Sequence, residues 1–128
     1  MSVREQIHVP GRPELSHSAD AVRTEDLVFV AGILPVDSER TLVGGDDVVL
    51  QARYVFGELE RILAAGGSSL ADVARVNLFL TDVDDRALIN PVRQEVFGGA
   101  RPASTLVEVS GLAISGAKIE VDAVAVVS

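Results

Sequence analysis

The chain contains no cysteine and no tryptophan, and it has only two histidines, His8 and His17. The absence of cysteine excludes thiol catalysis, disulfide bonds and cysteine-ligated metal sites. The histidines belong to an expected strand and an expected loop, and their separation is not that of two metal ligands on one element. We therefore expect neither a bound metal nor a cofactor.

Positive charge is also scarce. The chain has 11 Lys and Arg residues against 19 Asp and Glu residues, which gives a formal net charge of −8 at pH 7. Nucleic-acid binding depends on cationic side chains that neutralise phosphates. The charge therefore argues against a nucleic-acid partner and against RNA cleavage, unless an assembly gathers Arg23, Arg93 and Arg101 into one basic patch.

Long apolar runs are missing as well. No stretch reaches the length of a membrane span, and the first residues, MSVREQIHVPG, lack the apolar core of a signal peptide. We expect a cytoplasmic protein with no membrane partner. The 128 residues are 48% hydrophobic, with no break in composition, so we predict a single domain over 1–128.

Hydrophobic periodicity predicts an alternation of strands and helices. Strands are expected at 3–9, 20–25, 26–32, 73–80, 105–110 and 118–127. The nearly continuous apolar run at 26–32 is typical of a strand covered on both faces. An apolar stripe predicts a helix from Asp46 or Asp47 to Ala65, which Gly66 and Gly67 end.

Two further starts are read from capping patterns. Ser69 and Asp72 resemble a capping box that opens a single helical turn. The second helix is expected over 85–97, with Pro91 either in its first turn or breaking it, and Asn90 before Pro91 is typical of an N-cap followed by the first helical residue.

This order of elements predicts an α+β fold: a single mixed β-sheet with two helices packed on one face. Phe79, Val124 and Val126 alternate with polar residues and point to the opposite face. Because apolar groups are better covered by protein than by water, we expect a partner chain against that face.

The last expected strand carries two carboxylates, Glu120 and Asp122, on one side. In one interpretation both carboxylates belong to a solvated outer face. In the other, Glu120 enters a cleft, where it orients a water molecule or accepts a proton.

The closing segments are PASTLVEVSGLA at 102–113 and GAKIEVDAVAV at 116–126. They resemble the closing segments of the RidA/YjgF family of small enamine and imine deaminases. The resemblance extends through DLVFVAGILP at 26–35, the helix at 51–66, SLADVARVNLFLTDVDD at 69–85 and the segment 90–97. It implies a homotrimer whose sheets line a central barrel, with clefts for a small-molecule ligand between neighbouring subunits.

The resemblance also implies the site residues. Glu120 matches the glutamate that positions the hydrolytic water, and Ser104 stands where the family has an arginine that grips the substrate carboxylate; these two are the candidate catalytic residues. Ser18 matches a pocket tyrosine. The substrate-binding candidates are Ser18, His17, Ala31, Gly32, Asn90, Arg93, Arg101, Thr105 and Leu106, the last through its backbone N–H.

Two of these positions have plainer alternatives. His17 is the one histidine among the candidates, but an exposed loop histidine is the more ordinary interpretation of it. Gly32 either lets a ligand approach the backbone or marks an ordinary bulge.

A serine hydroxyl at position 104 cannot form the bidentate, charge-assisted clamp that a guanidinium forms with a carboxylate. We therefore expect an imine or enamine hydrolase whose substrate lacks the usual α-carboxylate, with Arg93 or Arg101 as candidates for a relocated anion contact. The alternative is a non-catalytic trimer that binds a ligand or partner through the same clefts.

Overall fold

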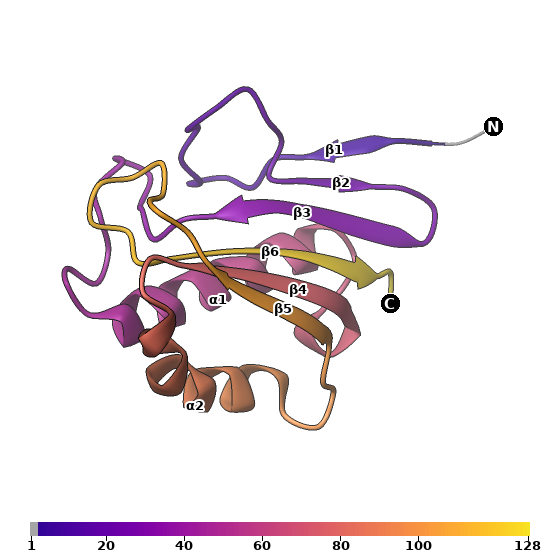
Figure 1. Cartoon of the computed structure of the whole chain (residues 1–128). Helices are drawn as coiled ribbons and strands as arrows, with labels where there is room; N and C mark the ends of the chain where they lie inside the picture. The colour runs from indigo at the N-terminus through magenta and orange to yellow at the C-terminus, as the bar shows by residue number, and fades with distance from the viewer. Residues whose placement is uncertain (1–2) are drawn as a thin grey trace.

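The chain folds in the order βββαβαββ, as its sequence patterns predict. A computed structural model describes residues 3–128; Met1 and Ser2, the start of the segment in which no signal peptide is expected, lie outside the described residues. The strands are β1 (Glu5–Ile7), β2 (Ala21–Arg23), β3 (Leu27–Ile33), β4 (Val73–Leu80), β5 (Ala103–Glu108) and β6 (Ile119–Val126). The helices are α1 (Val48–Ala65) and α2 (Arg86–Phe97), each preceded or followed by a short 3₁₀ turn, η1 (Leu70–Asp72) or η2 (Val83–Asp85) (Figure 1).

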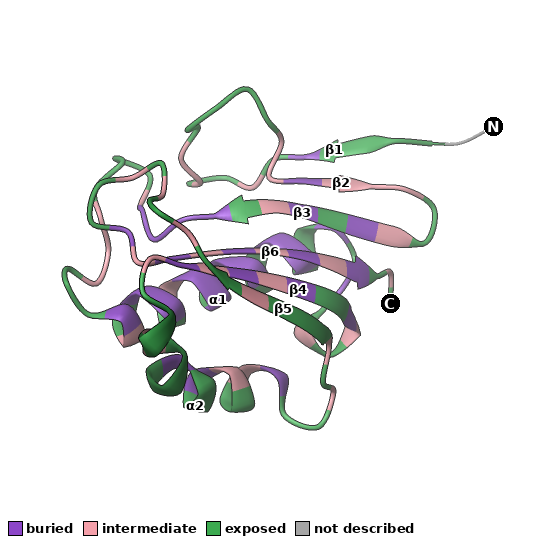
Figure 2. Cartoon of the chain, viewed as in Figure 1, coloured by how far each residue is buried: buried purple, intermediate pink, exposed green. Residues whose placement is uncertain are grey.

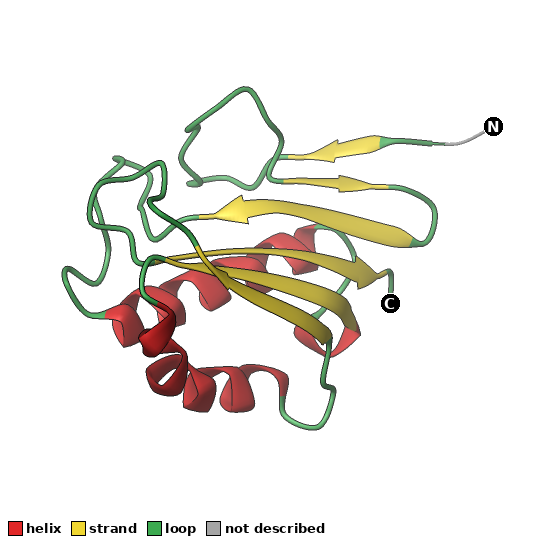
Figure 3. Cartoon of the chain, viewed as in Figure 1, coloured by secondary structure: helices red, strands yellow, loops and turns green. Residues whose placement is uncertain are grey.

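The six strands form one mixed sheet in the order β1-β2-β3-β6-β4-β5. β4 and β5 run parallel because α2 connects them, and the other neighbouring strands run antiparallel. Both helices lie against the same face of the sheet (Figure 3). The predicted fold class, a single mixed sheet with two helices on one face, is confirmed.

The core lies between the sheet and α1. Along β6, Ile119, Val121, Ala123 and Ala125 are buried and alternate with less buried residues, as a strand with two unlike faces requires (Figure 2). Phe56 of α1 packs edge-on against Phe97 of α2, with ring centroids 5.7 Å apart. The predicted apolar stripe of α1 is thus its buried face.

The other face of the sheet is open and partly apolar. Phe29, Val107 and Val126 are 44%, 41% and 45% exposed there. The prediction that 26–32 is covered on both faces is wrong for the single chain, because both helices cover the same side. The exposed apolar residues on the open face are the reason for predicting a partner chain against it.

The ends of α1 are as predicted. The Asp47 side chain accepts hydrogen bonds from the backbone N–H groups of Val49 (2.9 Å) and Leu50 (3.3 Å). Gly66 caps the other end, and Gly67 follows with φ of +81°, a conformation that glycine adopts without steric cost.

The predicted span of α2, 85–97, agrees with the structure to within one residue, but the predicted N-cap is wrong. The helix begins at Arg86, so Pro91 lies inside it and Asn90 is not its N-cap. The chain is already helical before Asn90, since η2 leads into α2 and the Asp82 carboxylate accepts a hydrogen bond from Asp84 N (2.9 Å). Pro91 has no N–H to donate, so the helix loses one internal hydrogen bond at this position.

The predicted capping box at Ser69 is also wrong in detail. A single 3₁₀ turn does open there, but Ser69 forms no side-chain bond to the backbone of that turn. Its hydroxyl donates instead to Asp72 Oδ2 at 2.7 Å.

Neither helix within residues 3–128 combines the length and the apolar character needed to cross a membrane.

Candidate functional site

Glu120 lies directly over Gly32 on the open face of the sheet. β3 and β6 change register between Val30 and Ile33, which marks a bulge at this point. A β-carbon built on Gly32 would overlap Glu120 Oε2 and would stand 3.0 Å from Glu120 Cδ. The glycine therefore provides the space that the carboxyl group of Glu120 occupies. Gly32 thus lies at a bulge, and a carboxyl group also approaches its backbone closely.

The surroundings of Glu120 favour its protonated form. Burial, and then the negative charge of Asp122, raise the pKa of Glu120 above the usual glutamate value. Asp122 itself accepts a hydrogen bond from Asn77 Nδ2 at 2.8 Å, whereas Glu120 accepts none from residues 3–128. Of the two carboxylates, Glu120 is thus the one with neither oxygen hydrogen-bonded within residues 3–128, and the one with a raised pKa.

The Glu120 carboxyl lines a cavity of about 320 Å³, which we call the Glu120 cavity. Its walls include Arg12, Ser18, Ala31 and Gly32. Ser18, Ala31, Gly32 and Glu120, which the resemblance assigned to one site, therefore lie together within a single chain. Sequence reasoning did not identify Arg12.

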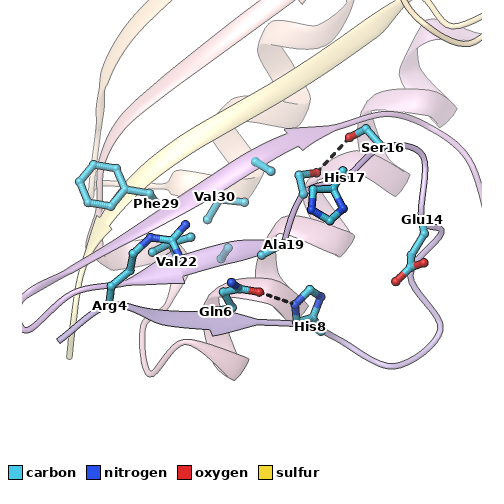
Figure 4. Close-up of a pocket in the computed structure, with 13 residues that line it drawn as sticks. Arg4, Gln6, His8, Glu14, Ser16, His17, Ala19, Val22, Phe29 and Val30 are labelled. Atoms are coloured by element: carbon cyan, nitrogen blue, oxygen red, sulfur yellow. Dashed lines mark hydrogen bonds between the residues drawn. The ribbon is translucent and has the colours of Figure 1, made fainter.

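His17 lines a hollow of about 630 Å³ beside the Glu120 cavity. Figure 4 shows the rings of His8 and His17 near one end of this hollow, with a hydrogen bond of 3.1 Å between the Ser16 and Ser18 hydroxyls. His17 is exposed, which fits the plainer interpretation of a loop histidine. Within residues 3–128 no three His, Asp or Glu side chains are grouped closely enough to hold a metal ion.

The loop that carries Ser18 is held in place by charged side chains. Arg12 Nε lies 3.4 Å from Asp20 Oδ1, and the Arg12 side chain is only 7% exposed. Asp20 Oδ2 also accepts a hydrogen bond from Val9 N at 2.8 Å. From outside the loop, Arg61 Nη2 donates to Pro10 O at 2.9 Å and Arg40 Nη2 to Glu14 O at 2.6 Å. This network fixes one wall of the Glu120 cavity.

Ser104 lies at the other edge of the sheet, on the helix-covered face. It pairs with Val76, a buried core residue, whereas Glu120 pairs with Phe79, whose side chain points to the open face. Thr105 turns to the open face, where its hydroxyl accepts from Arg75 Nη2 at 3.0 Å, and Leu106 packs against the core. One chain alone does not bring Ser104 and Glu120 together, and the cleft between subunits stays a prediction.

Ser104 contacts one of the two arginines that the sequence offers as candidates for a relocated anion contact. Arg93 Nη2 of α2 donates a hydrogen bond to Ser104 Oγ at 2.6 Å. Arg93 and Arg101 both line a cavity of about 520 Å³ at this edge, with further walls from Asn90, Gln94, Phe97, Gly98 and Pro102. A guanidinium of α2 thus contacts the residue that the resemblance matches to a strand arginine of the family.

Comparison with known proteins identifies the family. The family model described as Endoribonuclease L-PSP matches residues 11–127. Protein DfrA of Myxococcus xanthus is 37% identical to this chain, and the match covers 96% of this chain and 95% of DfrA. The 3-aminoacrylate deaminase RutC of Acinetobacter baylyi is 38% identical, and the match covers 88% of this chain and 89% of RutC. The crystal structure of RidA from Psychrobacter sp. PAMC 21119 superposes with a TM-score of 0.88 at 30% identity, covering 95% of this chain and 98% of that one. The chain therefore belongs to the Endoribonuclease L-PSP family, to which the RidA, YjgF and RutC proteins are assigned.

Proposed function

We propose that this protein hydrolyses a small imine or enamine to a carbonyl compound and ammonia. The observation that carries the proposal is the Glu120 carboxyl, half-buried over Gly32 in a cavity, with its pKa raised by burial and by Asp122. A general base works best when its pKa approaches the working pH. A relative 38% identical to the chain is named for the deamination of 3-aminoacrylate, an enamine.

The reaction needs one water molecule and one group that moves a proton. An enamine first takes a proton on carbon and becomes the iminium ion, the protonated form of the imine. Glu120 then removes a proton from water as the water oxygen bonds to the iminium carbon, which gives a neutral carbinolamine. The proton held by Glu120 passes to the carbinolamine nitrogen, the C–N bond breaks with release of ammonia, and the hydroxyl group loses its proton and becomes the C=O group. Hydroxyl groups and the Leu106 N–H polarise the substrate by hydrogen bonding.

The complete site in this proposal is a cleft between two subunits of a homotrimer. One subunit contributes Ser18, His17, Ala31, Gly32 and Glu120. Its neighbour contributes the edge of the sheet and the end of α2. The residues of that second group are Asn90, Arg93, Arg101, Ser104, Thr105 and Leu106. The opposite orientation of Ser104 and Glu120 in one chain supports this division.

The test is turnover by the purified protein of enzymatically generated 2-iminobutanoate and of a neutral cyclic imine. Replacing Glu120 by Gln removes the base with little change in shape, so kcat should fall by roughly 10²-fold or more. Glu60→Gln, at an exposed position of α1, is the matched control and should keep wild-type activity.

Absence of turnover with both imines, or full activity in Glu120→Gln, would contradict hydrolysis. A non-catalytic trimer that binds a ligand through the same clefts would then be the better account of the chain.

A further inference from the structure

The Glu120 cavity holds a positive charge in the same lining as the proposed base. Arg12 is the one Lys or Arg residue of 3–128 that lines this cavity, and its side chain is only 7% exposed. A guanidinium that pairs with a carboxylate stabilises the ionised form and lowers the pKa of the carboxyl group. A pair between Arg12 and Glu120 would therefore weaken Glu120 as a base. The site needs a second group that holds Arg12 elsewhere.

Asp20 is the carboxylate that pairs with Arg12. Arg12 Nε lies 3.4 Å from Asp20 Oδ1, and none of the ion pairs formed within residues 3–128 joins Arg12 to Glu120. The guanidinium still has unused capacity, because Arg12 Nη1 is buried and has no hydrogen-bond partner among the described residues. A buried N–H group without a partner is unfavourable. Arg12 would therefore gain by pairing with another carboxylate if Asp20 released it.

Asp20 is itself anchored on two sides. Its Oδ2 accepts a hydrogen bond from Val9 N at 2.8 Å, and its backbone oxygen accepts one from Ala31 N at 3.0 Å. The Asp20 side chain is 15% exposed. Ala31 directly precedes Gly32, over which the Glu120 carboxyl lies. The carboxylate that pairs with the arginine thus has a fixed place next to the bulge of β3.

We infer that Asp20 is a positioning residue of the site: it pairs with Arg12 and thereby keeps the guanidinium from pairing with Glu120. The inference rests on the proposed function, in which Glu120 is the base. Asp20 touches no reacting atom in this arrangement and acts only through Arg12. The unpaired state of Glu120 is thus a property of the cavity wall as much as of β6.

The other ionisable groups around Glu120 come from three parts of the chain. They are His8 and Glu14 in the cavity wall, Asp122 on β6 and Arg75 on β4. β3, which carries Gly32, has none. Arg75 donates to the Thr105 hydroxyl at 3.0 Å, and Asp122 accepts from Asn77. Within residues 3–128 no carboxylate other than that of Asp20 forms an ion pair with Arg12.

The experiment follows the ionisation of Glu120 without requiring turnover. Carbon-detected NMR measures the titration of its side-chain carboxyl, assigned by the resonance that Glu120→Gln lacks. Asparagine at position 20 keeps an oxygen for Val9 N but has no charge to hold Arg12. In Asp20→Asn, Glu120 should therefore titrate about one pH unit or more lower than in wild type. Adding Arg12→Met should return the titration close to the wild-type pH, because the cation is then gone.

The matched control is Asp47→Asn. Asp47 is the N-cap of α1 and lies outside the cavity, and asparagine caps a helix as well as aspartate does. This variant loses one carboxylate and should leave both the fold and the Glu120 titration unchanged. Asp20→Ser, which is also uncharged, serves the same test if Asp20→Asn does not fold.

Two results would overturn the inference. One is a Glu120 titration in Asp20→Asn that matches wild type. The other is a lowered titration that persists after Arg12→Met is added, because the change would then not pass through Arg12.

Kinetics separate this role from the proposed reaction. With 2-iminobutanoate, Asp20→Asn should move the acid limb of kcat/KM to lower pH and reduce kcat at least about 3-fold, and Arg12→Met should reverse both changes. If wild type turns over no imine but the NMR titration shifts as expected, the role of Asp20 stands and hydrolysis fails. If wild type hydrolyses imines and neither the titration nor the acid limb moves, hydrolysis stands and the role of Asp20 fails.

Discussion

At the scale of single residues, Glu120 is placed where its ionised form is costly. Its pKa in the folded chain is raised, so its contribution to stability is fully present below the pKa of an unfolded glutamate and is lost as the pH rises through the folded value. Ionisation of this carboxyl group therefore costs more free energy in the folded chain than in the unfolded one. A group kept at such a position is typical of a functional site.

The acid limb of the activity profile should depend on Asp122. The negative charge of Asp122 contributes to the raised pKa of Glu120, so Asp122→Asn should lower that pKa and move the acid limb of kcat/KM to lower pH. The measurement is a pH–rate profile with 2-iminobutanoate. Asp84→Asn, at an exposed acid of η2, should leave the limb in place, and a shift to higher pH in Asp122→Asn would contradict the assignment of Glu120 as the base.

Replacing Gly32 by a larger residue should displace the Glu120 carboxyl group. A methyl group there overlaps Glu120 Oε2, so Gly32→Ala should turn the carboxyl away and reduce kcat/KM by about 10²-fold. The matched control is Gly57→Ala in α1, where an added β-carbon meets nothing within 4 Å. That change should preserve activity and stabilise the fold by about 0.5–1 kcal/mol in denaturant unfolding, because alanine favours helix over glycine.

Wild-type activity in Gly32→Ala would mean that Glu120 has another productive orientation. A loss of activity in Gly57→Ala would point instead to a general sensitivity of the fold to glycine replacement.

Single residues also show what sequence could and could not predict of the site. Alternation along β6 places Glu120 on the face away from the helices, because strand periodicity is local. The contact between Arg93 and Ser104 depends on how α2 packs against the edge of the sheet, and no local pattern specifies that distance. Sequence therefore named Arg93 as a candidate site residue and placed Ser104 next to a predicted strand, but it could not predict the contact between the two.

At the scale of elements, Gln51 joins α1 to two loops. It is fully buried, and its Nε2 donates to Gly45 O at 2.8 Å and to Gly116 O at 3.0 Å. Its Oε1 accepts from Lys118 N at 2.7 Å. Because Lys118 lies two residues before Glu120, this one side chain fixes the approach of the chain to β6.

Replacing Gln51 by Leu should cost about 2–4 kcal/mol of unfolding free energy, since three backbone groups would lose their buried partner. Denaturant unfolding measures the effect. Leu50→Ala, at a neighbouring position that is 52% exposed, should change stability by no more than about 0.5 kcal/mol. A loss below about 1 kcal/mol in Gln51→Leu would show that water replaces the side chain.

The two helices differ in how well sequence predicted them. The start of α1 follows from Asp47 and its end from Gly66 and Gly67, all of which act within one turn. The span of α2 was predicted to within one residue, but Asn90 was misassigned as its N-cap, because η2 already leads the chain into a helix before Pro91. The order and type of the elements were predictable, whereas the place of Pro91 within α2 depended on competing local signals.

At the scale of the whole molecule, the open face of the sheet argues for an assembly. Phe29, Val107 and Val126 are large apolar side chains on that face, and the helices cover only the other one. Phe29→Asp would place a charge where a neighbouring subunit is expected, so it should convert a trimer into monomers. Native mass spectrometry and light scattering measure the change, with Leu88→Asp at an exposed position of α2 as the control. A monomeric wild type would contradict the trimer.

Mixed oligomers test whether the site is shared between subunits. Arg93 and Glu120 belong to opposite faces of one chain, so a substrate that contacts both must lie between two chains. Refolding Arg93→Met together with Glu120→Gln should then restore activity, since roughly one site in four would combine an intact Arg93 with an intact Glu120 from its neighbour in a symmetric assembly.

The control replaces the Arg93→Met chain by one that carries both substitutions. No site of that mixture contains an intact Glu120, so its activity should stay at the level of Glu120→Gln alone. If the first mixture is no more active than its two components, Arg93 and Glu120 act within one subunit or not on the same substrate. Because both variants keep the apolar residues of the open face, native mass spectrometry can verify that the mixed oligomers form before activity is compared.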